Sequence, residues 1–311
     1  MTSDRSESVR ANASFGVPRK ILVAVSDGGL SDAAVMFANE LAEAARAELD
    51  LLHALPVPTL VGLRLSEKEC AALEAERKVL LARDLSAALA KAALPEPASR
   101  SLTERLRVVA GQPPKVVLEE ARAKGVDLVV LGTSGKKNEL DFGGVARAVL
   151  SQAPCPVLLV PATARRVRKI LVPVDLSPAS LRALGVARDW ARMLGAKVLA
   201  IHCFSVPELV AYGIPEAPIA PMDFGIDELR ASAKERFERE MRAFSWGDVP
   251  WDARLYDDTP EQTLSEIQDD YDLMVLSTHG HTGLAAALLG SVAYTVLRRA
   301  RIPSLACPIR D

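Results

Sequence analysis

Two hydrophobic patterns take turns along this chain: short apolar runs, and longer segments with an apolar residue at every third or fourth position. Short runs rich in Val, Ile and Leu are typical of strands buried on both faces, whereas the wider spacing is typical of amphipathic helices. In the first half of the chain the predicted strands are 21–25, 49–54, 102–109, 128–131 and 157–160, and the predicted helices are 30–46, 66–93, 114–124 and 145–151. Strands that alternate with helices in this way predict an α/β fold with a doubly wound parallel sheet.

The second half of the chain repeats the first. The segment that begins RKILVAV at Arg19 reappears as RKILVPV at Arg168, and DLVVLGTSG at Asp127 reappears as DLMVLSTHG at Asp272. A third match pairs FGGVARAVL with LGSVAYTVL. Because an internal duplication determines the architecture, we predict two tandem domains that share one fold.

The duplication divides the chain into three parts. Residues 1–18 are polar and lack the apolar core of a signal peptide, so we expect a disordered tail there. Residues 19–163, called copy one below, and residues 168–311, called copy two, are each expected to form one Rossmann-like domain. A short link joins them.

Composition and charge are those of a soluble globular protein. Hydrophobic residues make up 49% of the chain and charged residues 25%, and the formal net charge is −2. We therefore expect neither a nucleic-acid partner nor a membrane partner. The cysteines are far apart in sequence and form no CxxC pair, which favours a reducing, cytoplasmic compartment.

The stretch 272–292 of copy two carries a candidate anion site. It predicts a strand that ends near Ser277, a loop that contains Gly280, and a helix that begins after Gly290 and Ser291. Glycines let the backbone approach a ligand, and the first turn of a helix presents N–H groups with partial positive charge. This combination often binds phosphate. A well-capped helix after a tight turn is the alternative interpretation.

Asp175 ends the first strand of copy two, at the sheet edge where doubly wound folds bind their ligands. A carboxylate in this place can accept hydrogen bonds from a ribose hydroxyl or an adenine amine. Alternatively Asp175, which is followed by Ser177 and Pro178, only caps the next helix. Because Asp175 and the glycine loop should converge at one edge, the combination favours a binding site.

These segments resemble the universal stress protein family. The resemblance is carried by KILVPVDLSPAS, by the strand that ends in His202 and by STHGHTGLAAALLGSV, and it extends over both copies. It implies two adenine-nucleotide-hydrolase-like domains related by a pseudo-two-fold axis. Nucleotide-binding members of the family carry G-x2-G-x9-G-[ST] after the fourth strand and an Asp at the end of the first. Copy two matches both features, except that Ser277 stands where the family has its first glycine.

The resemblance implies that copy two binds ATP or a related adenine nucleotide, with Mg²⁺ as a companion ion, and acts as a sensor or signalling module. The expected contacts are Pro173, Val174, Asp175, Cys203, Ser277, His279, Gly280, Gly290, Ser291 and Val292. No catalytic residue is identified, so we expect at most slow hydrolysis of ATP. A nucleotide-free scaffold for protein interaction and a slow ATP hydrolase are the alternatives.

Copy one departs further from the family pattern. Ser26 takes the place of the Asp, although Asp27 follows it, and the loop before Gly143 is two residues shorter than in copy two. Gly144 takes the place of the Ser. We therefore expect copy one to bind nucleotide weakly or not at all, and to serve as a pairing partner for copy two.

The resemblance also implies how the copies are arranged. The last strands, 157–160 and 304–306, would be sheet edges, which proteins cover. Single-copy members of the family cover them by forming dimers, so we expect the two copies to pair within one chain, and a further homodimer stays open as an alternative. The Pro-rich segment 204–225 is expected to fold over the site or onto a partner surface.

The four histidines form two pairs, one on a loop of copy two and one at the ends of equivalent strands. His279 and His281 form an H-x-H pair on a loop, and without an acidic or Cys neighbour we interpret them as polar loop residues rather than metal ligands. His53 and His202 end equivalent strands in the two copies. Their matching placement favours a structural role over a catalytic one.

Overall fold

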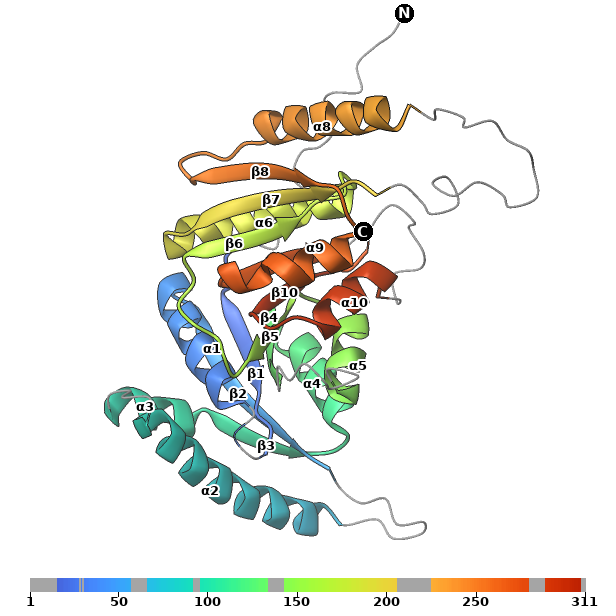
Figure 1. The fold of residues 1–311 in the computed structure, drawn as a ribbon. Helices are drawn as coiled ribbons and strands as arrows, with labels where there is room; N and C mark the ends of the chain where they lie inside the picture. Colours follow the sequence, from blue (N-terminus) through green and yellow to red (C-terminus); the bar gives the residue numbers. More distant parts are fainter. Residues whose placement is uncertain are drawn as a thin grey trace, which may run out of the picture.

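The computed structural model describes residues 16–27, 29, 31–56, 66–91, 96–133, 143–205, 225–279 and 289–308. These residues form a ten-stranded sheet in the order β3-β2-β1-β4-β5-β10-β9-β6-β7-β8, with helices on both faces (Figure 1). The order reads the same from either end once β1 is matched with β6, β2 with β7, β3 with β8, β4 with β9 and β5 with β10. The duplication seen in the sequence is therefore also present in the topology.

Copy one supplies the first half of the sheet. Its elements are β1 (Lys20–Ala24), α1 (Asp32–Ala45), β2 (Glu48–Leu55), α2 (Glu67–Lys91), α3 (Glu96–Glu104), β3 (Leu106–Ala110), α4 (Pro113–Ala123), β4 (Leu128–Thr133), α5 (Gly144–Gln152) and β5 (Val157–Pro161). The strands within copy one are parallel to one another. The predicted doubly wound parallel sheet is confirmed.

Copy two repeats this arrangement. Its elements are β6 (Lys169–Pro173), α6 (Pro178–Leu194), β7 (Lys197–Cys203), α8 (Ile226–Ala243), β8 (Trp251–Tyr256), α9 (Pro260–Ile267), the 3-10 turn η1 (Gln268–Asp270), β9 (Leu273–Ser277), α10 (Ser291–Arg298) and β10 (Ser304–Cys307). The Pro-rich segment 204–225, which was expected to cover the site or a partner surface, lies almost entirely outside the described residues.

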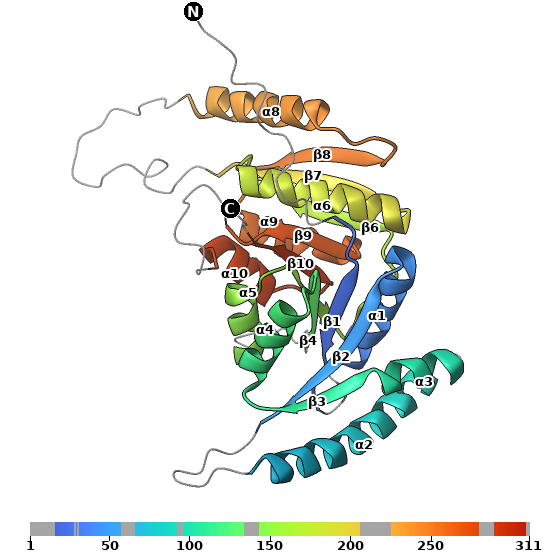
Figure 2. The ribbon, with the colours of Figure 1, turned by 180° about the vertical axis from the view of Figure 1, so that it is seen from behind.

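Both faces of the sheet are covered, which explains the uninterrupted apolar runs of the strands. Along β1, Ile21 and Val23 belong to the buried cluster that also includes residues of α1, α2 and α6, whereas Leu22 belongs to the cluster on the other side, with residues of α4 and α9. Helices α4 and α9 lie in front of the sheet in Figure 1, and α1 and α6 lie in front in the reverse view (Figure 2). The alternation of faces along each strand follows from the two-residue period of β structure.

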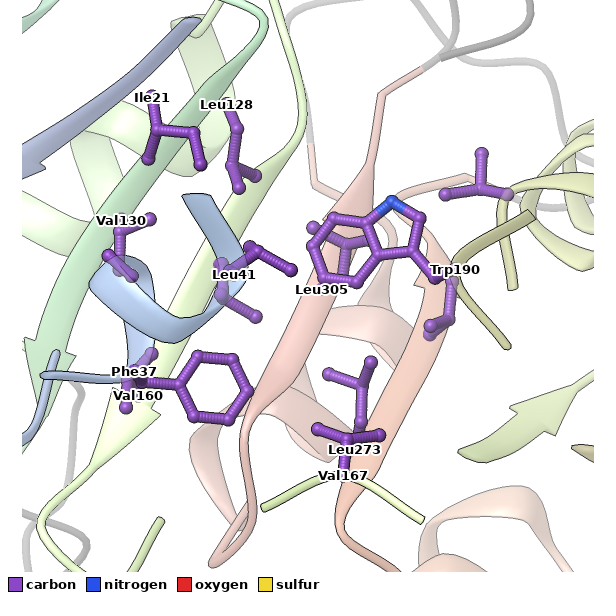
Figure 3. Close-up of a cluster of buried hydrophobic side chains, with 14 of the residues drawn as sticks. Ile21, Phe37, Leu41, Leu128, Val130, Val160, Val167, Trp190, Leu273 and Leu305 are labelled. Atoms are coloured by element: carbon purple, nitrogen blue, oxygen red, sulfur yellow. The ribbon is translucent and has the colours of Figure 1, made fainter. Parts of the chain in front are cut away.

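The two copies share one core. β5 and β10 pair antiparallel, with Leu158 opposite Leu305, so the last strands of the copies join the two half-sheets into one. Beneath this junction, buried side chains of copy one, the linker residue Val167 and side chains of copy two, among them Trp190, pack in a single cluster (Figure 3). The predicted pairing of the copies through their last strands within one chain is confirmed.

The start of one predicted strand is wrong. The segment 102–109 was expected to be a strand, but α3 extends to Glu104 and the strand β3 begins at Leu106. Leu102 and Leu106 are four residues apart, a helical spacing, and the two-residue alternation typical of a strand begins only with Leu106 and Val108. Leu102 is buried as part of the helix.

Equivalent aspartates tie the start of each first strand to the sheet. Asp127 accepts hydrogen bonds from the backbone N–H groups of Arg19 and Lys20 at 3.0 Å. Asp272 accepts the equivalent pair, from Arg168 and Lys169, at 2.9 Å. Only Asp272 is buried, and it also receives the guanidinium of Arg165 from the linker. The linker is thus held against copy two by a charged hydrogen bond.

Among the helices that the structure describes, none is long and apolar enough to cross a membrane.

Candidate functional site

The carboxyl ends of β6, β7 and β9 border a cavity of about 320 Å³ in copy two. It brings together every predicted contact that the structure describes: Pro173, Val174, Asp175, Cys203, Ser277, His279, Gly290, Ser291 and Val292. Gly280, also predicted, lies outside the described residues. The parallel strands end at one edge of the sheet, which explains how residues so far apart in sequence meet there.

Asp175 lies where β6 gives way to the turn before α6. Its Oδ1 accepts a hydrogen bond from the backbone N–H of Ser177 at 2.9 Å, across Leu176, which has a positive φ of 62°. The helix cap itself is Ser177, whose hydroxyl oxygen accepts from the N–H of Ser180 at 3.2 Å. Ser177 rather than Asp175 therefore caps the helix. The Asp175 carboxylate fixes the turn before the helix and also lines the cavity.

The first turn of α10 forms the opposite wall. Gly290 donates its N–H to the Thr278 carbonyl at 2.8 Å, and a Cβ at this glycine would lie 3.1 Å from that oxygen. The glycine is thus required by a close backbone contact within the protein. Within the described part of the chain, no side chain caps the N-terminus of α10, so the N–H groups beside Ser291 and Val292 have no side-chain acceptor among those residues. Such a turn suits an anion.

Ser277 and His279 shape the loop between these walls. The Ser277 hydroxyl, which stands where the family has a glycine, donates to the His279 carbonyl at 2.8 Å. The Thr278 hydroxyl lies 2.8 Å from His279 Nδ1 and holds the imidazole ring in place. His279 Nε2 is buried and has no hydrogen-bond partner among the described residues. If Thr278 donates to Nδ1, Nε2 carries the hydrogen and can donate it to a ligand.

The end of β7 supplies an apolar side of the cavity. Burial raises the pKa of the Cys203 thiol, so this side chain remains an uncharged thiol at neutral pH. The neighbouring His202 donates from Nδ1 to the Val174 carbonyl at 2.7 Å, and its ring stacks on Phe237 at 5.5 Å. These contacts agree with the structural role predicted for His202, although the ring also lines the cavity.

Sequence reasoning missed the part of the lining that comes from α9. Pro260 and Leu264 face the cavity, and Thr259 caps this helix through its hydroxyl. A Thr-Pro pair shortly after a strand signals a helix that begins at the carboxyl edge, so the signal was present in the sequence. Within the described residues, no group of three or more His, Cys, Asp or Glu side chains could hold a metal ion.

Copy one has a cavity of about 340 Å³ in the equivalent place. Ser26, Asp27 and Gly144, the residues that depart from the family pattern, line it together with His53. Asp27 forms an ion pair with Arg77, a residue of α2 that the sequence did not connect with this site. The loss of the family motif has therefore not filled the cavity.

Comparison with known proteins assigns both halves of the chain to one family. The sequence profile described as the universal stress protein family matches residues 18–161 and again 166–308. A universal stress protein of Mycobacterium tuberculosis is 30% identical over 213 residues, which are 66% of this chain and 69% of that protein. One from Mycolicibacterium smegmatis is 26% identical over 291 residues, 91% of this chain and 95% of that protein.

Solved structures share the fold over nearly the whole length. A universal stress protein from Archaeoglobus fulgidus covers 93% of this chain and 98% of its own, with a TM-score of 0.65 and 15% identity. A protein of Pseudomonas aeruginosa described as functionally unknown covers 94% of both chains, with a TM-score of 0.59 and 22% identity. With both halves matched by the profile, the chain belongs to the universal stress protein family and carries two copies of its domain.

Proposed function

We propose that copy two binds ATP or a related adenine nucleotide, and that the protein acts as a sensor or signalling module in the stress response. The observation that carries the proposal is the meeting, in one cavity, of Asp175 with the uncapped first turn of α10. The first group suits the adenosine end of a nucleotide and the second suits its phosphates. The cavity volume of about 320 Å³ lies at the lower end of the range typical of small-molecule sites.

The adenosine end is supported by polar and apolar groups together. The Asp175 carboxylate can accept hydrogen bonds from a ribose hydroxyl or an adenine amine. Val174, Ile201 and the uncharged Cys203 thiol offer an apolar surface for the base. Base recognition typically combines such a surface with a few placed polar groups.

The phosphate end depends on backbone groups rather than on cationic side chains. No Lys or Arg is found among the described residues that line the cavity. Phosphate charge would be balanced by the N–H groups of the first turn of α10, by the hydroxyl of Ser291, by His279 Nε2 and by Mg²⁺ bound to the nucleotide. Because no cationic side chain of the described lining balances the phosphates, we expect Mg²⁺ to strengthen ATP binding.

Two measurements test the proposal. Mass spectrometry and the absorbance of the natively purified protein should reveal a retained adenine nucleotide. Calorimetric titration with ATP and Mg²⁺ should show saturable binding, and both adenosine alone and tripolyphosphate alone should bind more weakly than ATP because each reaches only one end. Absence of ATP binding at about 1 mM, an affinity that corresponds to only about 4 kcal/mol, would contradict the proposal and favour a nucleotide-free scaffold.

A further inference from the structure

The cavity of copy one matches that of copy two in size but not in chemistry. Among its described lining residues, only Ser26, Asp27 and His53 have polar side chains, and the others are aliphatic residues, prolines and glycines. The Ser26 oxygen lies 3.3 Å from the hydroxyl of Ser31, so it is engaged within the protein. The polar groups left for a ligand are therefore Asp27 and His53.

His53 presents a hydrogen-bond acceptor to the cavity. Its Nδ1 lies 2.8 Å from the Val25 carbonyl, which can only accept, so Nδ1 carries the hydrogen. In the neutral ring Nε2 then carries a lone pair. The residue is 4% exposed, and Nε2 has no hydrogen-bond partner among the described residues. A buried acceptor without a partner is unfavourable, and a donor on a ligand would relieve this.

Asp27 supplies the second acceptor and the only charge in the described lining. Its Oδ1 lies 3.8 Å from His53 Nε2, so one ligand group can reach both. The carboxylate already holds a planar cation, because the Arg77 guanidinium forms an ion pair with it from α2. Arg77 is not itself a lining residue, and its Nε is buried without a hydrogen-bond partner among the described residues.

The Asp27–Arg77 pair can be exchanged readily. The Asp27 side chain is 57% exposed and the Arg77 side chain 29% exposed, so water reaches both partners, and ion pairs open to solvent contribute little to stability. An arriving cation would replace one guanidinium by another positive group, whereas an arriving anion would meet a carboxylate and a lone pair. The arrangement thus selects ligands by charge.

We propose that the cavity of copy one binds small organic cations, amidines or primary amines carried on an apolar body, which displace Arg77 from Asp27. Asp27 accepts two hydrogen bonds from the cationic group, His53 Nε2 accepts a third, and the aliphatic walls enclose the body. This site is separate from the nucleotide site proposed for copy two, and it has the opposite charge preference. Either proposal can fail without the other.

The test uses three probes of one shape and different charge: benzamidine, benzamide and benzoate. Ligand-observed NMR on the full-length protein should detect benzamidine with a dissociation constant of about 1 mM, as expected for a fragment. Benzamide should bind about tenfold more weakly, since it lacks the charge that strengthens the hydrogen bonds to Asp27. Benzoate should not bind this cavity.

Matched variants locate the binding in copy one. Asp27→Asn should abolish benzamidine binding, whereas Asp175→Asn in copy two should leave it unchanged. Arg77→Met, which removes the competing cation and keeps an apolar stem, should tighten binding about two- to fivefold. His53→Asn keeps the donor to the Val25 carbonyl and removes Nε2, so it should weaken binding about fivefold. Thermal unfolding curves establish that each variant is folded.

Three results would overturn the proposal. The first is no benzamidine binding to Arg77→Met at about 10 mM, a concentration well above the expected constant. The second is benzoate binding that disappears in Arg77→Met, which would make this an anion site. The third is benzamidine binding that is lost in Asp175→Asn and kept in Asp27→Asn, which would place it in copy two.

Discussion

The two copies have the same strand order and cavities of similar size, yet different side chains line the two cavities. In copy two a carboxylate at the end of β6 faces an uncapped helix turn that carries Ser291. In copy one the carboxylate has moved by one residue to Asp27, an arginine is paired with it, and Gly144 begins the helix. The comparison teaches that the fold maintains a cavity at this edge, and that a few side chains decide its chemistry.

The largest expected effect on ATP binding is that of Gly290→Val. A Cβ at Gly290 would lie 3.1 Å from the Thr278 carbonyl oxygen, so the loop must shift away from the turn that should hold the phosphates. We expect ATP affinity to fall about a hundredfold or more. The matched change in copy one is Gly143→Val, where a Cβ has no atom within 4 Å, although the positive φ of 89° disfavours a side chain there. It should leave ATP binding unchanged, and equal losses in calorimetry would contradict the comparison.

A stability difference should separate the equivalent aspartates. Asp272→Ala removes the acceptor of two backbone N–H groups and the carboxylate that is paired with the Arg165 guanidinium. The guanidinium keeps the carbonyls of Asp269 and Tyr271 as acceptors. The substitution should lower the free energy of unfolding by about 3 kcal/mol. Asp127→Ala, at an exposed position, should cost about 1 kcal/mol.

Tryptophan fluorescence in urea measures this difference, because Trp190 and Trp246 belong to the core that the two copies share and report its unfolding. Asp272→Ala should lower the urea midpoint clearly more than Asp127→Ala does. A larger shift for Asp127→Ala would show that the linker contact contributes nothing to the stability of copy two.

Exchanging the two cavity carboxylates for alanine tests the assignment of the adenosine end. Loss of a charged hydrogen-bond partner typically costs about 1.5–3 kcal/mol, so Asp175→Ala should weaken ATP about ten- to a hundredfold. Asp27→Ala should change ATP affinity little, because its cavity is assigned to a different ligand. Calorimetry in which Asp27→Ala has the larger effect would show that the nucleotide belongs to copy one.

The smallest effect is expected from the residue that begins each helix. Ser291→Gly removes one neutral hydroxyl, so ATP affinity should fall about two- to tenfold. The reverse change, Gly144→Ser, fits sterically because no atom lies near its Cβ. By itself it should not create an ATP site while Arg77 remains on Asp27. A second ATP site in Gly144→Ser would mean that the hydroxyl alone distinguishes the copies.

Much of the fold and of the copy-two cavity could be predicted because each strand and helix pattern occurs in both copies, so one copy supports the interpretation of the other. Strands buried on both faces read as apolar runs, and the ends of parallel strands necessarily meet at one edge. The start of β3 at Leu106 was missed because Leu102 and Leu106 are four residues apart. This spacing fits one turn of a helix and also the two-residue alternation of a strand.

Contacts between distant segments could not be predicted. The pairing of Arg77 with Asp27 depends on where a surface arginine of α2 meets the end of β1, and local periodicity does not specify such a contact. The close approach of Gly290 to the Thr278 carbonyl likewise depends on the packing of a helix against a strand end. The sequence marked this glycine as a ligand contact, and the structure adds that the protein itself requires it.

The most direct test of the central claim is the stoichiometry of ATP on the full-length chain. Calorimetry with ATP and Mg²⁺ should give one nucleotide per chain for the unaltered protein. The same stoichiometry should hold for Asp27→Ala, and binding should be severely weakened in Asp175→Ala. Two nucleotides per chain, or binding that survives Asp175→Ala and disappears in Asp27→Ala, would contradict the assignment of the nucleotide to copy two.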